Sequence, residues 1–296
     1  MLLRHIRYFL AVAEHQNFTQ AAAALHVSQP TLSQQMKQLE ESLGARLFDR
    51  SAKNVRLTDA GEAWKHYAKR ALQDIDAGAR AVHEVGTLVR GTLRFAAPPT
   101  FTPYLIGAAI DRFYRLYPGV TIHFSEIDQD QIEAWLVDDK LDVGLGFDSV
   151  HLAEFESAAI FLETLSFVVG AAHRCARQAA AMTLTQFQAE PLVLLNQAFA
   201  TRQHINAYCK AHDIVPHVAV EVNSISALVE VVQRGMLGTV LPNQITAIHQ
   251  ELVAIALEPP MPPRKISVLR RKGAHHSAAS TAFIAVLKAC FGELAS

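Results

Sequence analysis

The sequence predicts an α/β protein in two parts: an all-α winged helix-turn-helix with a long linking helix, and then a two-lobed α/β domain. Up to residue 90 the apolar spacing is mainly that of helices, whereas strands and helices alternate from residue 91 onward. A length of 296 residues suits two or three domains. The net charge of −1 conceals a basic beginning, because residues 1–70 hold ten of the 27 Lys/Arg but six of the 28 Asp/Glu. Such an asymmetry indicates that one end of the chain meets a polyanion, although charge scatter is the alternative.

Three short helices are expected at the N-terminus. Apolar residues at helical spacing predict the first from Leu3 to Ala13. Thr19 is the expected N-cap of an alanine-rich helix over 20–25, and Ser28 is the expected N-cap of a third helix that has Pro30 in its first turn.

The third helix has one apolar face and one polar face, as a DNA-reading helix does. We expect its polar face to contact bases and phosphates through Gln29, Thr31, Ser33, Gln34 and Lys37. Glutamine can form two hydrogen bonds with adenine, and hydroxyl groups can serve several bases. Helix pairs of this kind also occur in all-α domains without DNA, so this alternative stays open on the pattern alone.

A two-stranded hairpin, or wing, is expected between residues 47 and 58. Its basic residues Arg50, Lys53 and Arg56 are placed to touch phosphates or to enter the minor groove. Solvated surface charge is the alternative for these three side chains. The winged helix-turn-helix is therefore expected over residues 1–58.

A linking helix is expected over residues 59–90, with Thr58 as its cap. Its apolar residues are spaced alternately four and three apart, at Trp64, Ala68, Ala71, Ile75, Gly78, Val82, Val85 and Val89. Such a heptad seam is typical of helices that pair. We expect dimerisation here, because a palindromic DNA site needs a two-fold partner, and packing within one chain is the alternative.

Residues 91–296 are expected to form two similar α/β lobes with a cleft between them. The predicted strands are 92–96, 120–126, 141–147, 165–170, 192–195, 218–221, 238–241 and 266–269, and the predicted helices are 102–117, 129–138, 202–212, 224–234 and 278–291. Two loops, Pro99–Thr102 and Asn196–Thr201, run into helix N-termini. Free backbone N–H groups and hydroxyls there can hold a small anion, with simple helix capping as the alternative.

Several classes of function are not expected. Cys175, Cys209 and Cys290 are far apart and odd in number, so we expect reduced thiols without disulfides or metal. No cofactor, signal peptide or membrane-spanning segment is expected, and the protein should be cytoplasmic. Catalytic motifs are missing, so an enzyme acting on a small anion is a minor alternative, as is a solute-binding protein of a transporter. His275 and His276 adjoin each other in a loop without further ligands.

The N-terminal residues carry a family resemblance. The segments that carry it are 9–14, 17–22, 25–33, 39–40, 43–44, 47–50 and 57–61. They resemble the winged helix-turn-helix of LysR-type transcription regulators over nearly all of residues 1–65. The resemblance implies promoter DNA as a partner, a homodimer or homotetramer, and an effector domain whose lobes resemble type 2 periplasmic binding proteins. It places lobe I at 91–162 and 267–296 and lobe II at 163–266.

The resemblance also implies roles for individual residues. Gln34 stands where many members have arginine, which implies fewer phosphate contacts or another base preference. Arg202 is expected either to pair with an acidic side chain across the lobes or to balance an anionic effector. The effector contacts it implies are Thr100, Thr102, Gly146, Phe147, Phe199, Thr201 and Asn223. Segments 57–62, 199–202, 223–227 and 269–272 are similar to the cyanate-operon regulators of this family, which makes cyanate the expected effector.

Overall fold

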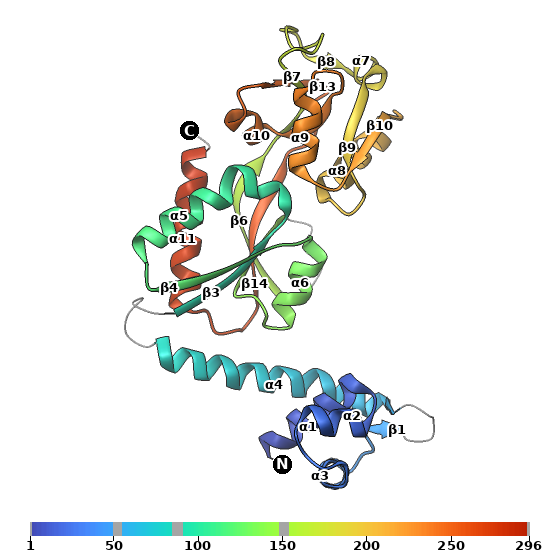
Figure 1. The fold of residues 1–296 in the computed structure, drawn as a ribbon, viewed down its shortest axis with the longest axis vertical. Helices are drawn as coiled ribbons and strands as arrows, with labels where there is room; N and C mark the ends of the chain where they lie inside the picture. The colour runs from blue at the N-terminus through green and yellow to red at the C-terminus, as the bar shows by residue number, and fades with distance from the viewer. Residues whose placement is uncertain (1, 50–54, 85–90, 148–153, 295–296) are drawn as a thin grey trace. The chain divides into compact units, whose positions relative to one another are not determined.

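The structure is a computed structural model that describes residues 2–49, 55–84, 91–147 and 154–294. The chain divides into two compact units, Met1–His83 and Glu84–Ser296. Both predicted parts are thus present, and Figure 1 shows a helical first unit and a mixed α/β second unit.

The first unit is built as a winged helix-turn-helix. Its elements are α1 (Leu3–His15), α2 (Phe18–Ala24), α3 (Gln29–Leu43), β1 (Phe48–Asp49), β2 (Arg56–Leu57) and α4 (Asp59–Glu84). Ser28 caps α3 as predicted, since its hydroxyl accepts the backbone N–H of Thr31. The predicted cap of α2 was wrong: Asn17, not Thr19, accepts the first free N–H groups. Phe18, the first residue of α2, is half-buried and packs edge-on against Phe48 at 5.7 Å.

The hairpin forms the expected wing. Strands β1 and β2 are antiparallel, with Phe48 opposite Leu57 and Asp49 opposite Arg56. Gly61 of α4 lies so close to the hairpin that a Cβ atom there would come 2.2 Å from the Leu47 carbonyl oxygen. The predicted wing residues Arg50 and Lys53 lie outside the described residues.

Helix α4 begins as predicted, since the Thr58 hydroxyl accepts the N–H of Gly61. The seam divides into two parts. Trp64 and Ala68 pack into the core of the first unit, so that part of the seam is used within the chain. Further along, Ala71, Ile75 and Gly78 are exposed. The side chains of Val82, Val85 and Val89 lie outside the described part.

Lobe I of the second unit is a five-stranded sheet in the order β4-β3-β5-β14-β6. The strands are β3 (Gly91–Ala97), β4 (Val120–Glu126), β5 (Val143–Phe147), β6 (Phe155–Glu163) and β14 (Arg264–Arg271). Helices α5 (Gly107–Leu116) and α11 (Ala278–Leu294) cover one face, and α6 (Gln129–Val137) covers the other (Figure 1). Alternation along β3 serves both faces, because Phe95 packs with Phe283 and Ala96 packs with Ile132.

Lobe II contains the remaining elements. They are β7 (Leu165–Gly170), β8 (Met182–Thr183), α7 (Leu184–Ala189), β9 (Pro191–Leu195), α8 (Ala200–Ala211), β10 (His217–Val222), α9 (Ile225–Gln233), β11 (Thr239–Pro242), α10 (Asn243–Ile248), β12 (Leu252–Ile255) and β13 (Leu257–Glu258). β7 lies between β11 and β12, and β9 pairs with β10 in parallel. The sheet of β9 and β10 meets the sheet of β7 at an isolated bridge between Leu192 and Gly238. A Cβ atom on Gly238 would come within 2.2 Å of the Phe167 ring, so only glycine fits there.

Two details of the second unit differ from the prediction. The helix expected over 102–117 follows a 3-10 turn η1 (Pro99–Phe101), begins as a wider π-helix η2 (Thr102–Ile106), and becomes a regular α-helix only at α5. Strand β14 pairs with β6 from Arg264 onward, so the return to lobe I occurs three residues before the expected position 267. In the described part of the chain, no helix is both long and apolar enough to span a membrane.

Candidate functional site: a reading helix and a cleft lined by carboxylates

The outer face of α3 carries the predicted DNA contacts. Gln29, Thr31, Gln34 and Lys37 are exposed and Ser33 is half-buried. Several of these groups bond to one another: Gln29 Nε2 donates to Ser33 Oγ at 3.0 Å, and the Thr31 and Ser28 hydroxyl oxygens are 2.7 Å apart. These exposed bonds can be exchanged for bonds to bases or phosphates at little cost, since a hydrogen bond between exposed groups contributes little net free energy.

The opposite face of α3 fixes the orientation of the helix. Leu32, Met36 and Leu39 are fully buried against α1 and the wing. Glu40 Oε1 accepts the backbone N–H groups of Leu47 and Phe48 at 2.8 and 3.2 Å, which joins the end of α3 to β1. Arg56 of β2 is exposed, and it is the wing cation that the described residues include.

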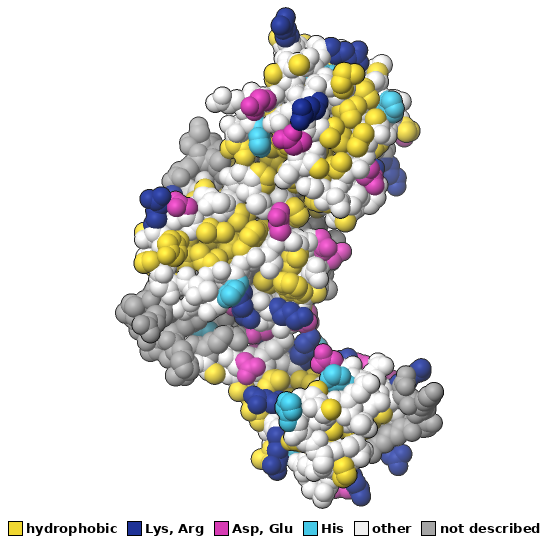
Figure 2. Space-filling view, in the orientation of Figure 1, with side chains coloured by type: hydrophobic (Ala, Val, Ile, Leu, Met, Phe, Trp, Pro, Cys, Tyr) yellow, Lys and Arg dark blue, Asp and Glu magenta, His cyan; other side chains and the backbone are white. Residues whose placement is uncertain are grey.

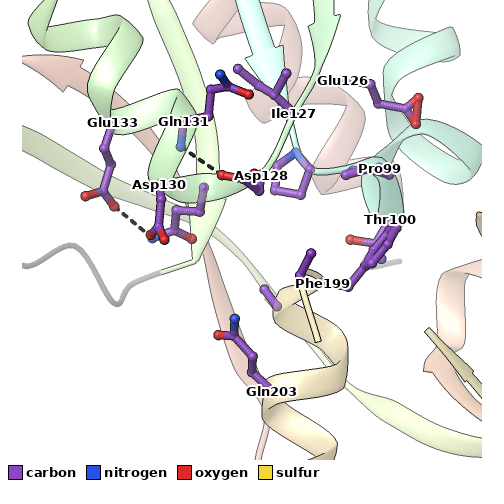
Figure 3. A pocket seen from close by; sticks show the side chains of 14 residues that line it. Pro99, Thr100, Glu126, Ile127, Asp128, Asp130, Gln131, Glu133, Phe199 and Gln203 are labelled. Atoms are coloured by element: carbon purple, nitrogen blue, oxygen red, sulfur yellow. Dashed lines mark hydrogen bonds between the residues drawn. The ribbon is translucent and has the colours of Figure 1, made fainter. Parts of the chain in front are cut away.

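The second unit contains a cavity of about 930 Å³ between its lobes. From lobe I it is lined by the start of η1, the end of β4 and the first turn of α6, and from lobe II by the start of α8. Figure 3 shows Thr100 and Pro99 facing Phe199 across this space. Of the predicted effector residues, Thr100 and Phe199 line this cavity.

A second cavity of about 660 Å³ shares part of its wall with the first. Thr102, Phe199 and Asn223 line it, and Pro99, Glu126 and Phe199 border both cavities. The structure therefore brings four of the seven predicted effector residues to one cleft.

The hydroxyl groups of Thr100 and Thr102 are buried and lack any hydrogen-bond partner among the described residues. Thr100 is 2 % exposed. A buried hydroxyl without a partner costs about 1–3 kcal/mol. These two groups beside the cleft are candidates for contact with a ligand that has hydrogen-bonding atoms.

The described residues that line the first cavity include carboxylates but neither Lys nor Arg. These carboxylates belong to Glu126, Asp128, Asp130 and Glu133. Asp128 caps α6, since its Oδ1 accepts the N–H of Gln131 at 2.8 Å, a bond that Figure 3 draws. This acidic lining was not predicted, because part of it lies at the end of β4 and not in the loops before helices. Acidic walls disfavour a simple anion and favour a ligand that also carries a cation or N–H donors.

Three of the predicted effector residues line neither cavity. Gly146 and Phe147 are buried at the end of β5, where Gln129 covers them: its Oε1 accepts the N–H of Phe147 and its Nε2 donates to the Phe147 carbonyl oxygen, at 2.9 and 3.2 Å. Thr201 is also buried, and its hydroxyl is occupied by Arg264. Gln129 is thus a residue of the cleft wall that the sequence analysis missed.

A buried polar network, here called the Arg264 junction, joins the lobes through Tyr104, Glu163, Thr201 and Arg264. Arg264 Nε donates to Glu163 Oε2 at 2.9 Å, and Nη2 donates to the same oxygen. Tyr104 donates to the other Glu163 oxygen at 2.6 Å, and both Arg264 Nη atoms donate to Thr201 Oγ1 at 3.3 Å. Burial, reinforced by the Glu163 charge, raises the pKa of Tyr104 well above its ordinary value.

The Arg264 guanidinium also lies 4.0 Å from the centre of the Phe147 ring. Such a cation–π contact places a buried charge on the electron-rich face of the ring. Arg202, by contrast, pairs within lobe II, where its Nη1 donates to Glu221 Oε2 at 2.8 Å and to the Leu195 carbonyl at 2.7 Å. Arg202 therefore pairs with an acidic side chain of its own lobe, and the expected pairing across the lobes was wrong.

A helix-turn-helix unit joined to a two-lobed unit with a ligand cleft defines a ligand-responsive transcription regulator. Family models agree: "Bacterial regulatory helix-turn-helix protein, lysR family" matches residues 3–62, and "LysR substrate binding domain" matches residues 86–291. The chain belongs to the LysR family of DNA-binding transcription regulators, which carry an effector-binding domain.

Relatives of known sequence place the chain broadly within this family. It is 30% identical to the uncharacterised regulator YnfL of Escherichia coli K12, over 81% of this chain and 82% of that protein. It is 28% identical to a hydrogen peroxide-inducible genes activator of Dickeya chrysanthemi, over 92% of this chain and 90% of that protein. These relatives lend no support to a specific likeness to the cyanate-operon regulators.

Solved structures match the whole chain. A full-length OxyR variant from Pseudomonas aeruginosa is 25% identical and gives a TM-score of 0.69 over 98% of this chain and 94% of that one. CbnR bound to its target DNA is 23% identical, with a TM-score of 0.62 over 98% of this chain and the whole of that one. The latter likeness bears on the fold alone.

Proposed function

We propose that this regulator reads promoter DNA through α3 and the wing, and that a small molecule held in the cleft of the second unit changes that binding. The observation that carries the effector part is the pair of buried, unpartnered hydroxyls of Thr100 and Thr102 beside the two cavities. The predicted contacts Gly146, Phe147 and Thr201 act in this proposal as support for the cleft wall.

The chemistry of the cleft favours an effector with two unlike ends. The hydroxyl groups of Thr100 and Thr102 can donate hydrogen bonds to a carboxylate or another acceptor at one end of the effector, as expected for a small anion. The carboxylates of Glu126, Asp130 and Glu133 suit an ammonium group or N–H donors at the other end. An amino-carboxylate meets both requirements, whereas cyanate, the effector suggested by the segment similarity, meets only the first.

A binding experiment on the full chain tests this proposal. Fluorescence anisotropy would follow binding to the DNA upstream of its own gene at fixed salt, with cyanate, acetate, a simple amine or a set of amino-carboxylates. We expect an amino-carboxylate to shift the midpoint and cyanate or acetate to act only at higher concentration. If DNA binds but none of these compounds shifts the midpoint or the footprint, the effector part of the proposal is wrong.

The DNA part is tested separately by two variants. Gln34→Ala should relax preference at one base pair, with a loss of about 1–3 kcal/mol on the preferred sequence. Arg56→Ala should weaken binding to all sequences and lower the salt slope by about 0.9 if it contacts one phosphate. Equal losses on specific and random DNA for Gln34→Ala would contradict a base-reading role.

We propose that two chains pair through α4. The exposed part of its seam, Ala71, Ile75 and Gly78, supports this, because an exposed apolar stripe on a helix is normally covered by a partner. Figure 2 shows a second hydrophobic patch over α5, where Tyr114 and Leu116 are each 57% exposed, and this patch suits a further contact in a tetramer. Sedimentation of Ile75→Glu should show a shift toward monomer.

Peroxide sensing through a thiol is not favoured in this chain, although several relatives activate peroxide-inducible genes. A sensor cysteine needs an accessible thiolate. Burial raises the pKa of both Cys175 and Cys209, and Cys209 and Cys290 are buried in different apolar cores.

A further inference from the structure

Lobe II contains a cluster of three unlike metal-binding side chains away from the cleft. His173 and Cys175 lie in the turn that follows β7, and Glu190 lies between α7 and β9. One ligand atom from each lies within 4.8 Å of those of the other two. His173 and Glu190 are buried, and Cys175 is half-buried, which leaves a way in from the surface.

The distances within the cluster are near those around a tetrahedral ion. Cys175 Sγ lies 3.3 Å from Glu190 Oε1, and His173 Nε2 lies 3.7 Å from Glu190 Oε2. Around a tetrahedral Zn²⁺ ion, a carboxylate oxygen should lie about 3.6 Å from a thiolate sulfur and about 3.4 Å from an imidazole nitrogen. Each observed separation differs from its expected value by about 0.3 Å, and the two involve different oxygens of Glu190, so the Glu190 carboxylate would have to turn slightly to bind one ion.

One carboxylate oxygen of the cluster is buried without a hydrogen bond. Glu190 is 4 % exposed, and its Oε2 has no hydrogen-bond partner among the described residues. His173 Nε2 faces this oxygen at 3.7 Å, which is too long for a hydrogen bond. Glu190 Oε1, by contrast, accepts from Cys175 Sγ and from the largely exposed Arg174. A cation between Oε2 and the imidazole would remove this defect.

We propose that His173, Cys175 and Glu190 bind one divalent transition-metal ion, with Zn²⁺ the best fit. Nitrogen, sulfur and carboxylate donors in a small site are the ligand set of tetrahedral zinc, and three protein ligands leave the fourth position to water. The site is separate from the effector cleft, and the proposal does not depend on the chemistry of the effector.

Binding requires a defined movement of protons. The Cys175 thiol gives its proton to water and binds as thiolate, so one proton is released for each Zn²⁺ bound. The His173 ring proton moves from Nε2 to Nδ1, and Nδ1 then gives up the backbone N–H of Cys175 that it accepts at 3.2 Å. The ion, thiolate and Glu190 carboxylate together are neutral, which frees Arg174 to turn toward solvent.

A metal here would connect two strands of lobe II. The turn carrying His173 follows β7, and Glu190 immediately precedes β9. At its other end β9 leads into the loop of Phe199, which lines both cavities. The ion would therefore stiffen the base of the strand that presents one wall of the cleft.

Metal titration of the untagged full chain tests the site. Co²⁺ should bind at one equivalent per chain and give the near-ultraviolet charge-transfer band of a cobalt–thiolate bond, which Zn²⁺ then removes by displacement. Zn²⁺ at about 100 times its dissociation constant should raise the Tm of the second unit by about 5–10 °C. Cys175→Ser should abolish the band, and Glu190→Gln should weaken Zn²⁺ binding at least tenfold.

Control variants separate this site from other thiols and histidines. Cys209→Ala, a buried thiol of the same lobe, and His275→Ala should keep both the band and the stoichiometry. If Cys175→Ser does not fold, as judged by circular dichroism, Glu190→Gln and His173→Gln provide the test through loss of affinity. The proposal is overturned if the wild-type chain gives no thiolate band, or if the band persists in Cys175→Ser.

Discussion

The polar groups of the second unit fall into two contrasting regions at the boundary between its lobes. In the Arg264 junction, Glu163 is 0 % exposed, yet each of its oxygens accepts a hydrogen bond. Beside the cleft, the hydroxyls of Thr100 and Thr102 are equally buried but have no partner. A network in which every group is hydrogen-bonded holds the two lobes together. Unpartnered hydroxyls can instead form their hydrogen bonds with a ligand, and those bonds then contribute to the free energy of binding. The same comparison assigns Thr201 to the junction.

Breaking the junction should produce the largest effect. Glu163→Gln removes one partner of a buried ion pair and leaves the Arg264 charge uncompensated, at a cost of about 3–5 kcal/mol. For a unit of this size the Tm should fall by about 6–20 °C. Calorimetry of the full chain would follow the transition of the second unit.

The double variant Glu163→Gln/Arg264→Met is the matched control. It removes both charges together, so it should recover part of the loss, because no buried charge is left alone. Losses that simply add would show that Glu163 and Arg264 do not act as a pair.

Replacing Thr100 with valine, which has the same shape but no hydroxyl group, should not lower stability. Thr100→Val removes a buried group that bonds to nothing in the described chain, so the Tm should stay the same or rise slightly. Effector affinity should fall about tenfold or more, the loss expected for one hydrogen bond to a charged group. Isothermal titration with the active amino-carboxylate would measure it, and an unchanged affinity would remove Thr100 from the site.

Removing one carboxylate from the acidic lining should change effector affinity by a smaller amount. Glu126 is exposed and borders both cavities. Because exposed ion pairs contribute about 0.2–1 kcal/mol, Glu126→Gln should weaken an amino-carboxylate by about fivefold at most. The same variant should strengthen a simple anion such as acetate, and a loss for both ligands would contradict an electrostatic role for this carboxylate.

Much of the fold could be predicted because periodicity and capping are local. Strands β4 and β7 have the predicted bounds, and Ser28 caps α3 as expected. Strand β6 was missed, because its middle, Ser157-Ala158-Ala159, lacks the β-branched and aromatic residues typical of strands. It forms at the edge of the sheet because β14, far along the sequence, pairs with it.

The site was predicted less completely, since its chemistry depends on which distant residues meet. The loops before helices led to the prediction of Thr100, Thr102 and Phe199, and these three residues line the two cavities. Sequence alone could not show that Arg264 would occupy Thr201, or that Gln129 would cover Phe147. Each of these contacts joins residues 18 or more positions apart and depends on how the sheets are assembled.

The smallest effect on stability should come from the protonation of His204, which lies at the edge of the junction. Burial, and then the nearby Arg264 charge, lower the pKa of His204, and its Nε2 lies 2.8 Å from the Pro262 carbonyl oxygen. The folded chain therefore keeps His204 neutral at a pH at which the unfolded chain already binds a proton. Stability should fall as the pH drops below about 6.5, until the folded-state pKa is reached. His204→Gln should flatten the Tm difference between pH 8 and pH 5.5, whereas the exposed His217→Gln should not. If the Tm difference between pH 8 and pH 5.5 is unchanged in His204→Gln, the Arg264 charge does not affect the protonation of this ring. The electrostatic effect of the junction would then be limited to the pairing of Glu163 with Arg264.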